Sequence, residues 1–168
     1  MIEFSEAGAF GALSAVCTLM GQVQAKGEQI AWVETGKTLF FPPDLAFRGL
    51  DLEAISVILA PEVRAGLQGA QWLLRSGSFG LIVIDGISSA IDEAVLGRLA
   101  RMAEDQRTAV VFLTRKKPTE PSLGTQLSLR GSIWLSSSGE TMVQAVKDKR
   151  SGSTSPQKVS LHGPFGLY

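Results

Sequence analysis

The hydrophobic pattern of the chain alternates between short apolar runs and longer amphipathic segments. The apolar runs have the length and composition of strands, and the run at 81–85 indicates a strand that is buried on both faces of a sheet. They span residues 2–4, 30–33, 55–59, 81–85 and 109–113. The run from Leu81 to Asp85 is central, because it is almost wholly apolar, lies between Gly80 and Gly86, and ends in a carboxylate.

The segments between these runs have helical periodicity. Apolar residues recur every three or four positions, which predicts helices with one buried face. The apolar positions are Leu13, Val16, Cys17, Met20 and Val23 in the first helix, Val63, Leu67, Ala70 and Leu74 in a helix opened by Pro61, and Ile91, Val95, Leu99 and Met102 in a third. A short helix capped by Asp44 and ending at Gly49 is also expected. This alternation predicts an α/β fold with a largely parallel central sheet flanked by helices on both faces.

The pattern changes from residue 132 onward. Short strands are expected there, separated by turn residues with no helix between them, and they are interpreted as antiparallel additions to one edge of the sheet. They span residues 133–135, 142–146 and 159–161. The chain, residues 1–168, is interpreted as a single domain that begins almost inside its first strand, which suggests flanking segments beyond its termini.

Composition and charge argue against several classes of protein, namely strongly basic nucleic-acid binders, disulfide-linked or zinc proteins, and membrane proteins. The 168 residues are 45% apolar, and 16 basic residues balance 16 acidic ones, so any nucleic-acid site must be local. With one cysteine and one histidine, neither an internal disulfide nor a zinc site is expected. No apolar run approaches the roughly 20 residues of a membrane helix, and the N-terminus lacks the basic region of a secretory signal. A cytoplasmic protein that does not contact membranes is predicted.

The carboxylate at the end of the central strand raises the question of nucleotide binding. In nucleotide-dependent proteins such an Asp orients Mg²⁺ beside a phosphate-binding loop with the pattern G-x-x-x-x-G-K-[ST]. The degenerate loop here contains Glu6, Gly8, Gly11, Ala12 and Leu13. Glu6 stands where the first glycine is required, Ala12 replaces the lysine and Leu13 replaces the hydroxyl. We therefore expect no bound nucleotide, metal or other cofactor, and we interpret Asp85 as a relic.

Several segments in fixed order resemble the RecA-like superfamily over nearly the whole chain. They are residues 31–51, the RSGSFGLIVID segment at 75–85, the VVFLT strand at 110–114, and residues 146–149. Within the superfamily the chain is most similar to the ImuA family. In that family a signature recurs that consists of LLRSG followed by Phe, Gly, an aliphatic stretch and Asp. The chain departs from the superfamily at the residues that hydrolyse ATP. Glu34 lies two positions before the expected catalytic glutamate, and Thr114 and Arg115 stand where recombinases carry an Asn-Gln pair.

The resemblance implies a RecA-like core that is not an enzyme. It would act as an accessory protein in SOS mutagenesis and translesion synthesis, binding a RecA-type recombinase and an ImuB-like polymerase-family protein and interfering with recombinase filaments. Two alternatives remain open at this stage. One is a DNA-dependent ATPase with a degenerate phosphate loop, and the other is a cell-division inhibitor similar to SulA.

Two groups of residues are candidate binding surfaces. A basic loop and a nearby arginine are candidates for weak contacts with DNA phosphates that do not depend on base sequence. These residues are Arg115, Lys116, Lys117 and Arg130. The candidates for partner binding are two lysines, which match lysines that recombinase protomers extend toward a neighbour, and an aromatic segment. They are Lys147, Lys149, Phe40, Phe41 and Phe47.

Overall fold

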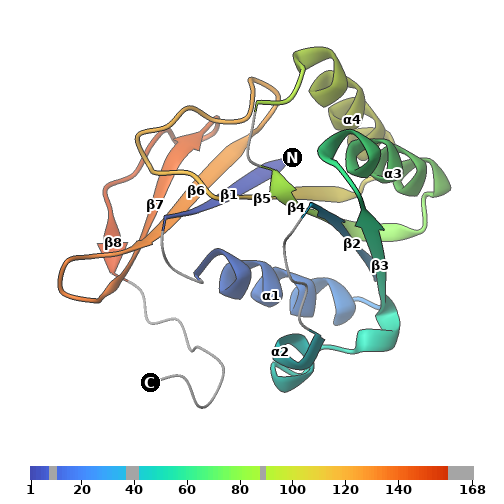
Figure 1. Cartoon of the computed structure of the whole chain (residues 1–168), viewed down its shortest axis with the longest axis horizontal. Coiled ribbons are helices and arrows are strands. Elements are labelled where there is room, and N and C mark those ends of the chain that lie inside the picture. Colours follow the sequence, from blue (N-terminus) through green and yellow to red (C-terminus); the bar gives the residue numbers. More distant parts are fainter. Residues whose placement is uncertain (8–10, 37–41, 88–89, 159–168) are drawn as a thin grey trace.

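An eight-stranded mixed sheet forms the centre of the molecule (Figure 1). The computed structural model describes residues 1–7, 11–36, 42–87 and 90–158. The strand order is β3-β2-β4-β5-β1-β6-β7-β8. The strands are β1 (Ile2–Ala7), β2 (Gln29–Thr35), β3 (Ile55–Ala60), β4 (Phe79–Ile87), β5 (Ala109–Thr114), β6 (Leu129–Leu135), β7 (Thr141–Asp148) and β8 (Gln157–Lys158). The expected α/β architecture with a largely parallel sheet is confirmed.

Helices cover both faces of the sheet, as the periodicity predicts (Figure 1). The helices α1 (Gly11–Gln24) and α2 (Pro42–Phe47) lie on one face, and α3 (Val63–Ser76) and α4 (Glu93–Asp105) lie on the other. A single 3₁₀ turn, η1 (Leu52–Ala54), precedes β3. Successive residues of the central strands enter opposite cores: Val33 and Ile84 pack with α3 and α4, whereas Trp32 and Val83 pack with α1 and α2. This explains why these strands are apolar at nearly every position.

The C-terminal strands agree only in part with the expectation. The strands β7 and β8 are antiparallel additions at the sheet edge. The interpretation of residues 133–135 as an antiparallel strand holds toward β7 and is wrong toward β1, because β6 begins at Leu129 and is parallel to β1. The physical reason is that residues 115–128 carry the chain from the carboxyl end of β5 back to the opposite end of the sheet before β6 starts. The expected strand at 159–161 lies outside the described residues.

Capping residues explain where α3 ends and where α4 begins. At the C-terminus of α3, Gly77 adopts a left-handed conformation with φ 65°, and its N–H donates to the Leu74 carbonyl. At the N-terminus of α4, Asp92 accepts a hydrogen bond from the Ala94 N–H at 2.6 Å. The prediction that Asp44 caps the short helix is wrong, because Asp44 lies within the first turn of α2, which begins at Pro42.

Candidate functional site

The carboxyl ends of β2, β4, β5 and β1 meet at one edge of the sheet, where open α/β sheets bind ligands. This edge brings together Glu6, Asp85 and Arg115 from three different strand ends. Ser5 is paired with Thr114 in the ladder, so Glu6 and Arg115 each follow that pair by one residue. Asp85 comes from β4, on the other side of β5. The structure therefore groups these three predicted residues around the end of β5.

A glycine shapes this edge directly after Asp85. Gly86 has φ 87°, and the ladder between β4 and β5 shifts register there. A Cβ at this position would lie 2.2 Å from the Thr35 carbonyl oxygen, so only glycine allows β4 to approach β2 so closely. The Thr35 Oγ1 hydroxyl also donates to the Asp85 carbonyl oxygen at 2.7 Å. These contacts fix the ends of β2 and β4 together.

The electrostatics of the edge disfavour an anionic ligand. Burial raises the pKa of the Glu6 carboxyl, the nearby Arg115 lowers it, and the carboxylate of Asp85 raises it again. Two acidic side chains, Glu6 and Asp85, thus lie close enough to influence each other electrostatically. A triphosphate bound here would face like charges, which repel it.

Apart from Glu6, the described residues that correspond to the phosphate-binding loop are apolar. Gly11 and Ala12 are buried at the start of α1, and Leu13 packs against the α1 core. Ser14, the next hydroxyl along the chain, accepts a hydrogen bond from Arg48 Nη2 at 2.9 Å, which ties α1 to the end of α2. Gly8 lies outside the described residues. Among the residues that are described, no group of three or more His, Cys, Asp and Glu side chains is placed to hold a metal ion.

A second polar centre lies inside the sheet and was missed by sequence reasoning. Glu3 of β1 is fully buried and receives hydrogen bonds from the loop that follows β5. Thr114 Oγ1 donates to Glu3 Oε1 at 3.0 Å, and Ser122 Oγ and the Leu123 N–H donate to Glu3 Oε2 at 3.1 and 2.9 Å. The Lys116 ammonium lies 2.7 Å from Glu3 Oε1. Glu3 therefore anchors the loop of residues 115–128 to the sheet.

Arg130 of β6 completes this buried centre. Its side chain is only 1% exposed, and its Nε lies 3.6 Å from Glu3 Oε1. Its Nη2 donates to the Lys117 carbonyl oxygen at 2.8 Å and to Ser5 Oγ at 3.3 Å, and its Nη1 donates to the Glu120 carbonyl oxygen. The guanidinium thus satisfies buried acceptors of the loop.

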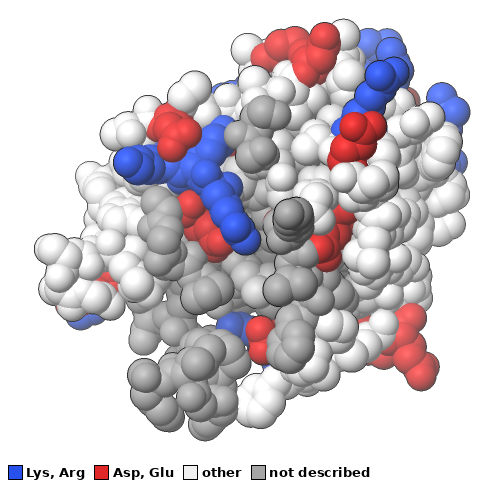
Figure 2. All heavy atoms as spheres, viewed as in Figure 1, with Lys and Arg blue, Asp and Glu red and all other residues white. Residues whose placement is uncertain are grey.

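The contacts of Glu3 reduce the number of basic residues that are available to bind DNA. Lys116 has a side chain that is 10% exposed and Arg130 is buried, so neither is available to DNA phosphates while the loop keeps this conformation. Arg115 and Lys117 are exposed. Figure 2 shows basic and acidic side chains interspersed on the face in view. The exposed candidates for a DNA contact are therefore Arg115 and Lys117.

The paired lysines of β7 have different environments. Lys147 is partly buried, and its Nζ donates to the Gly124 carbonyl oxygen at 3.0 Å. Burial lowers the pKa of the Lys147 ammonium, Lys149 lowers it further, and Glu3 acts in the opposite direction. Lys149 is exposed in the turn that follows β7. Arg130 and Lys147 are partners in the β6–β7 ladder, so Lys147 borders the Glu3 centre.

The apolar candidates lie near the other edge of the sheet. Phe47 ends α2 and is 60% exposed, whereas Phe40 and Phe41 lie outside the described residues. The terminal strand β3 adds two exposed apolar side chains, Val57 at 41% and Leu59 at 75%. Residues 55–59 contained no signal for this, because four of the five are apolar and only the strand order places β3 at the edge of the sheet.

The chain has no significant match among protein-family models or among curated protein sequences. In the part of the chain that the structure describes, no helix is both long and apolar enough to cross a membrane. The fold and the site define an α/β protein with a mixed, mostly parallel sheet. The edge formed by the carboxyl ends of its parallel strands carries two carboxylates, those of Glu6 and Asp85.

Proposed function

We propose that this chain is a non-catalytic RecA-like accessory protein in DNA damage tolerance. It binds a RecA-type recombinase and an ImuB-like polymerase-family protein, and it caps recombinase filaments because it offers a protomer-like surface without completing an ATP-bridged joint. The observation that carries the proposal is the sheet edge beside α1, where Ala12 stands in place of the lysine that a nucleotide requires and the acidic Glu6 stands in place of the first glycine.

The start of α1 supports the same conclusion. A helix N-terminus binds phosphate when its N–H groups are joined by a lysine and a hydroxyl that reaches Mg²⁺. Here Ala12 and Leu13 supply neither, and the hydroxyl of Ser14 is bonded to Arg48. A fold that keeps the sheet and the central Asp without these groups suits recognition of a partner better than hydrolysis.

The edge strand β3 supports binding of a protein partner. It is the terminal strand of the described sheet, and Val57 and Leu59 are exposed along it. A free strand edge with apolar side chains accepts an added strand, with backbone hydrogen bonds giving affinity and side-chain pockets giving specificity. Phe47 and Lys149 are further contact candidates, at α2 and after β7.

Two measurements test the proposal. Calorimetry with Mg²⁺ and ATP should show no heat of binding, and a dissociation constant below about 100 µM would favour the ATPase alternative. Strand exchange by a RecA-type recombinase should fall at substoichiometric amounts of this protein, and a direct assay should detect association between the two. Unchanged strand exchange together with no association would overturn the proposal.

Two exposed positions locate the contact surface. Leu59→Lys places a charge on the β3 edge, and Lys149→Glu reverses the charge after β7. Because both side chains are exposed, the fold should tolerate both changes. The variant that relieves inhibition of strand exchange identifies the edge that meets the recombinase. Arg101→Glu, on an exposed position of α4, serves as the charge-reversal control.

A further inference from the structure

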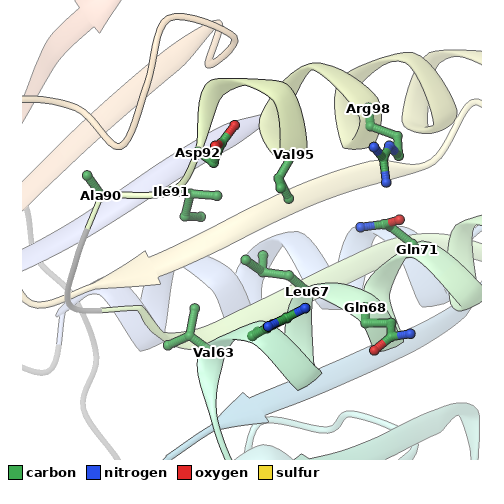
Figure 3. A pocket seen from close by; sticks show the side chains of 10 residues that line it. Val63, Leu67, Gln68, Gln71, Ala90, Ile91, Asp92, Val95 and Arg98 are labelled. Atoms are coloured by element: carbon green, nitrogen blue, oxygen red, sulfur yellow. The ribbon is translucent and has the colours of Figure 1, made fainter.

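A groove runs between α3 and α4 on the face of the sheet opposite α1 (Figure 3). Its volume is about 540 Å³. Its apolar lining includes Leu67 from α3, Val95 from α4, and Ile91 from the segment before α4. Leu67 and Ile91 belong to the buried core, whereas Val95 is only partly covered. The groove therefore presents apolar side chains at its base and stays open to solvent.

The rim of the groove is positively charged. Arg64 comes from α3 and Arg98 from α4, and both are exposed. Figure 3 shows Arg98 extending from α4 toward Gln71 on α3, so polar groups from the two walls approach each other. The groove also has one acidic residue in its lining, Asp92, whose carboxylate already accepts the Ala94 N–H at the start of α4.

We propose that the α3–α4 groove is the docking site for a short acidic amphipathic segment of a protein partner. Apolar side chains of that segment occupy the base formed by Leu67, Ile91 and Val95, and its carboxylates pair with Arg64 and Arg98. Guanidinium groups suit this task because they bind carboxylates through two parallel hydrogen bonds. A helix that lays an apolar face into a groove between two helices is an established mode of peptide recognition.

Charge and shape together select this occupant. A nucleic-acid strand would match the two arginines through its phosphates but has no use for the aliphatic base of the groove. A small ligand normally has most of its surface buried in its pocket, and a groove with exposed rim residues gives less enclosure. Trp72 is 62% exposed and lies one helical turn beyond Gln68 of the groove, so it extends the apolar surface available to a segment. The inference does not depend on the partner being a recombinase.

Selection from a display library of random 16-residue peptides tests the assignment. Peptides that bind the full chain should be enriched in Asp and Glu next to Leu, Ile, Phe or Trp. The affinity of the best peptides is then measured by fluorescence anisotropy for two double variants. Arg64→Glu with Arg98→Glu reverses the rim, and Lys26→Glu with Arg150→Glu is the matched control, with the same charge change on exposed positions that follow α1 and β7 and do not line the groove.

The rim reversal should weaken binding by at least about tenfold, since it places like charges opposite the peptide. The control should leave the affinity within about twofold of the wild type, because its charges lie away from the groove. A third variant, Val95→Asn, places a polar side chain in the apolar base without changing charge and should also weaken binding, with circular dichroism confirming that all variants fold.

Three results would overturn the assignment. One is selection without enrichment of acidic and apolar residues. Another is selected peptides whose binding is the same in the rim reversal and in the control. The third is that the rim reversal weakens binding of a single-stranded oligonucleotide but not of the peptides. In that case the groove would bind the phosphate backbone of a nucleic acid instead.

Discussion

Glu3 is a fully buried carboxylate between two cationic side chains, Lys116 and Arg130. Replacing it by glutamine keeps the shape of the side chain but leaves both cations without their counter-charge. Because an uncompensated buried charge is costly, Glu3→Gln should lower the free energy of unfolding by about 3–5 kcal/mol. Urea denaturation followed by circular dichroism measures this change.

An exposed ion pair provides the matched control. Lys158 Nζ lies 2.5 Å from Glu140 Oε1, and both side chains are open to solvent. Glu140→Gln should change the free energy of unfolding by less than about 1 kcal/mol. Equal effects of the two substitutions would show that the Glu3 centre contributes no more than a surface pair.

The buried contacts of Glu3 could not be predicted from the sequence around Lys116 and Arg130. Lys116 and Arg130 were predicted to face DNA because they lie in or near a basic run, and local sequence does not reveal that their partner is more than 100 positions earlier. The available signal was a carboxylate at the centre of an apolar run, between Ile2 and Phe4. When such a carboxylate is buried in the sheet, it requires a partner of opposite sign or hydrogen bonds.

At the scale of elements, two glycines of α3 have opposite surroundings. A Cβ on Gly66 would lie 2.2 Å from Thr35 Cγ2 and 3.4 Å from Val33 Cγ1, whereas a Cβ on Gly69 would meet nothing within 4 Å. Gly66→Ala should therefore force α3 away from β2 and cost about 1–3 kcal/mol. Gly69→Ala should stabilise the protein by up to about 1 kcal/mol, because alanine favours the helix.

Thermal denaturation of both variants checks this prediction, and the melting temperatures should move in opposite directions. If Gly66→Ala melted at or above the wild-type temperature, the close approach of α3 to the sheet would not hold. Because both changes are Gly to Ala in one helix, helix propensity is the same in each, and the difference reports packing alone.

Elements were easier to predict than their arrangement. Periodicity located the helices and strands because each helix and strand buries a face defined by local spacing. The order of the strands depends on long-range pairing, and β1 pairs with β5 and β6 although β2 follows it in sequence. The grouping of Glu6, Asp85 and Arg115 depends on this strand order, and the α3–α4 groove depends on side-chain geometry, so no local pattern contained either of them.

At the scale of the whole molecule, charge balance limits DNA binding. The 16 basic and 16 acidic residues cancel, and Arg115 and Lys117 are the exposed members of the basic loop. Any affinity for single-stranded DNA that this loop provides should be weak, independent of base sequence and sharply reduced between about 50 and 200 mM salt. Replacing both residues by alanine should abolish that affinity and leave the melting temperature nearly unchanged, because Lys116 and Arg130 are kept.

Fluorescence anisotropy with oligonucleotides of different composition measures this binding at several salt concentrations. Arg75→Ala with Arg101→Ala removes the same number of exposed charges elsewhere and should have little effect. Equal losses in the two double variants, or binding that salt does not weaken, would place the DNA contact on another surface.

The position of β1 has a consequence for the order in which the molecule is completed. Among the strands of the described sheet β1 is synthesised first, yet its neighbours arrive late, since Ile2 pairs with Val111 on one side and with Leu129 on the other. At typical rates of translation, the interval between the synthesis of these partners is roughly 6 to 25 s. During that time the apolar side chains of Ile2 and Phe4 have no sheet to enter. Although β1 is synthesised before the other strands of the described sheet, it thus gains both of its neighbours only after β2, β3, β4 and β5 have been made.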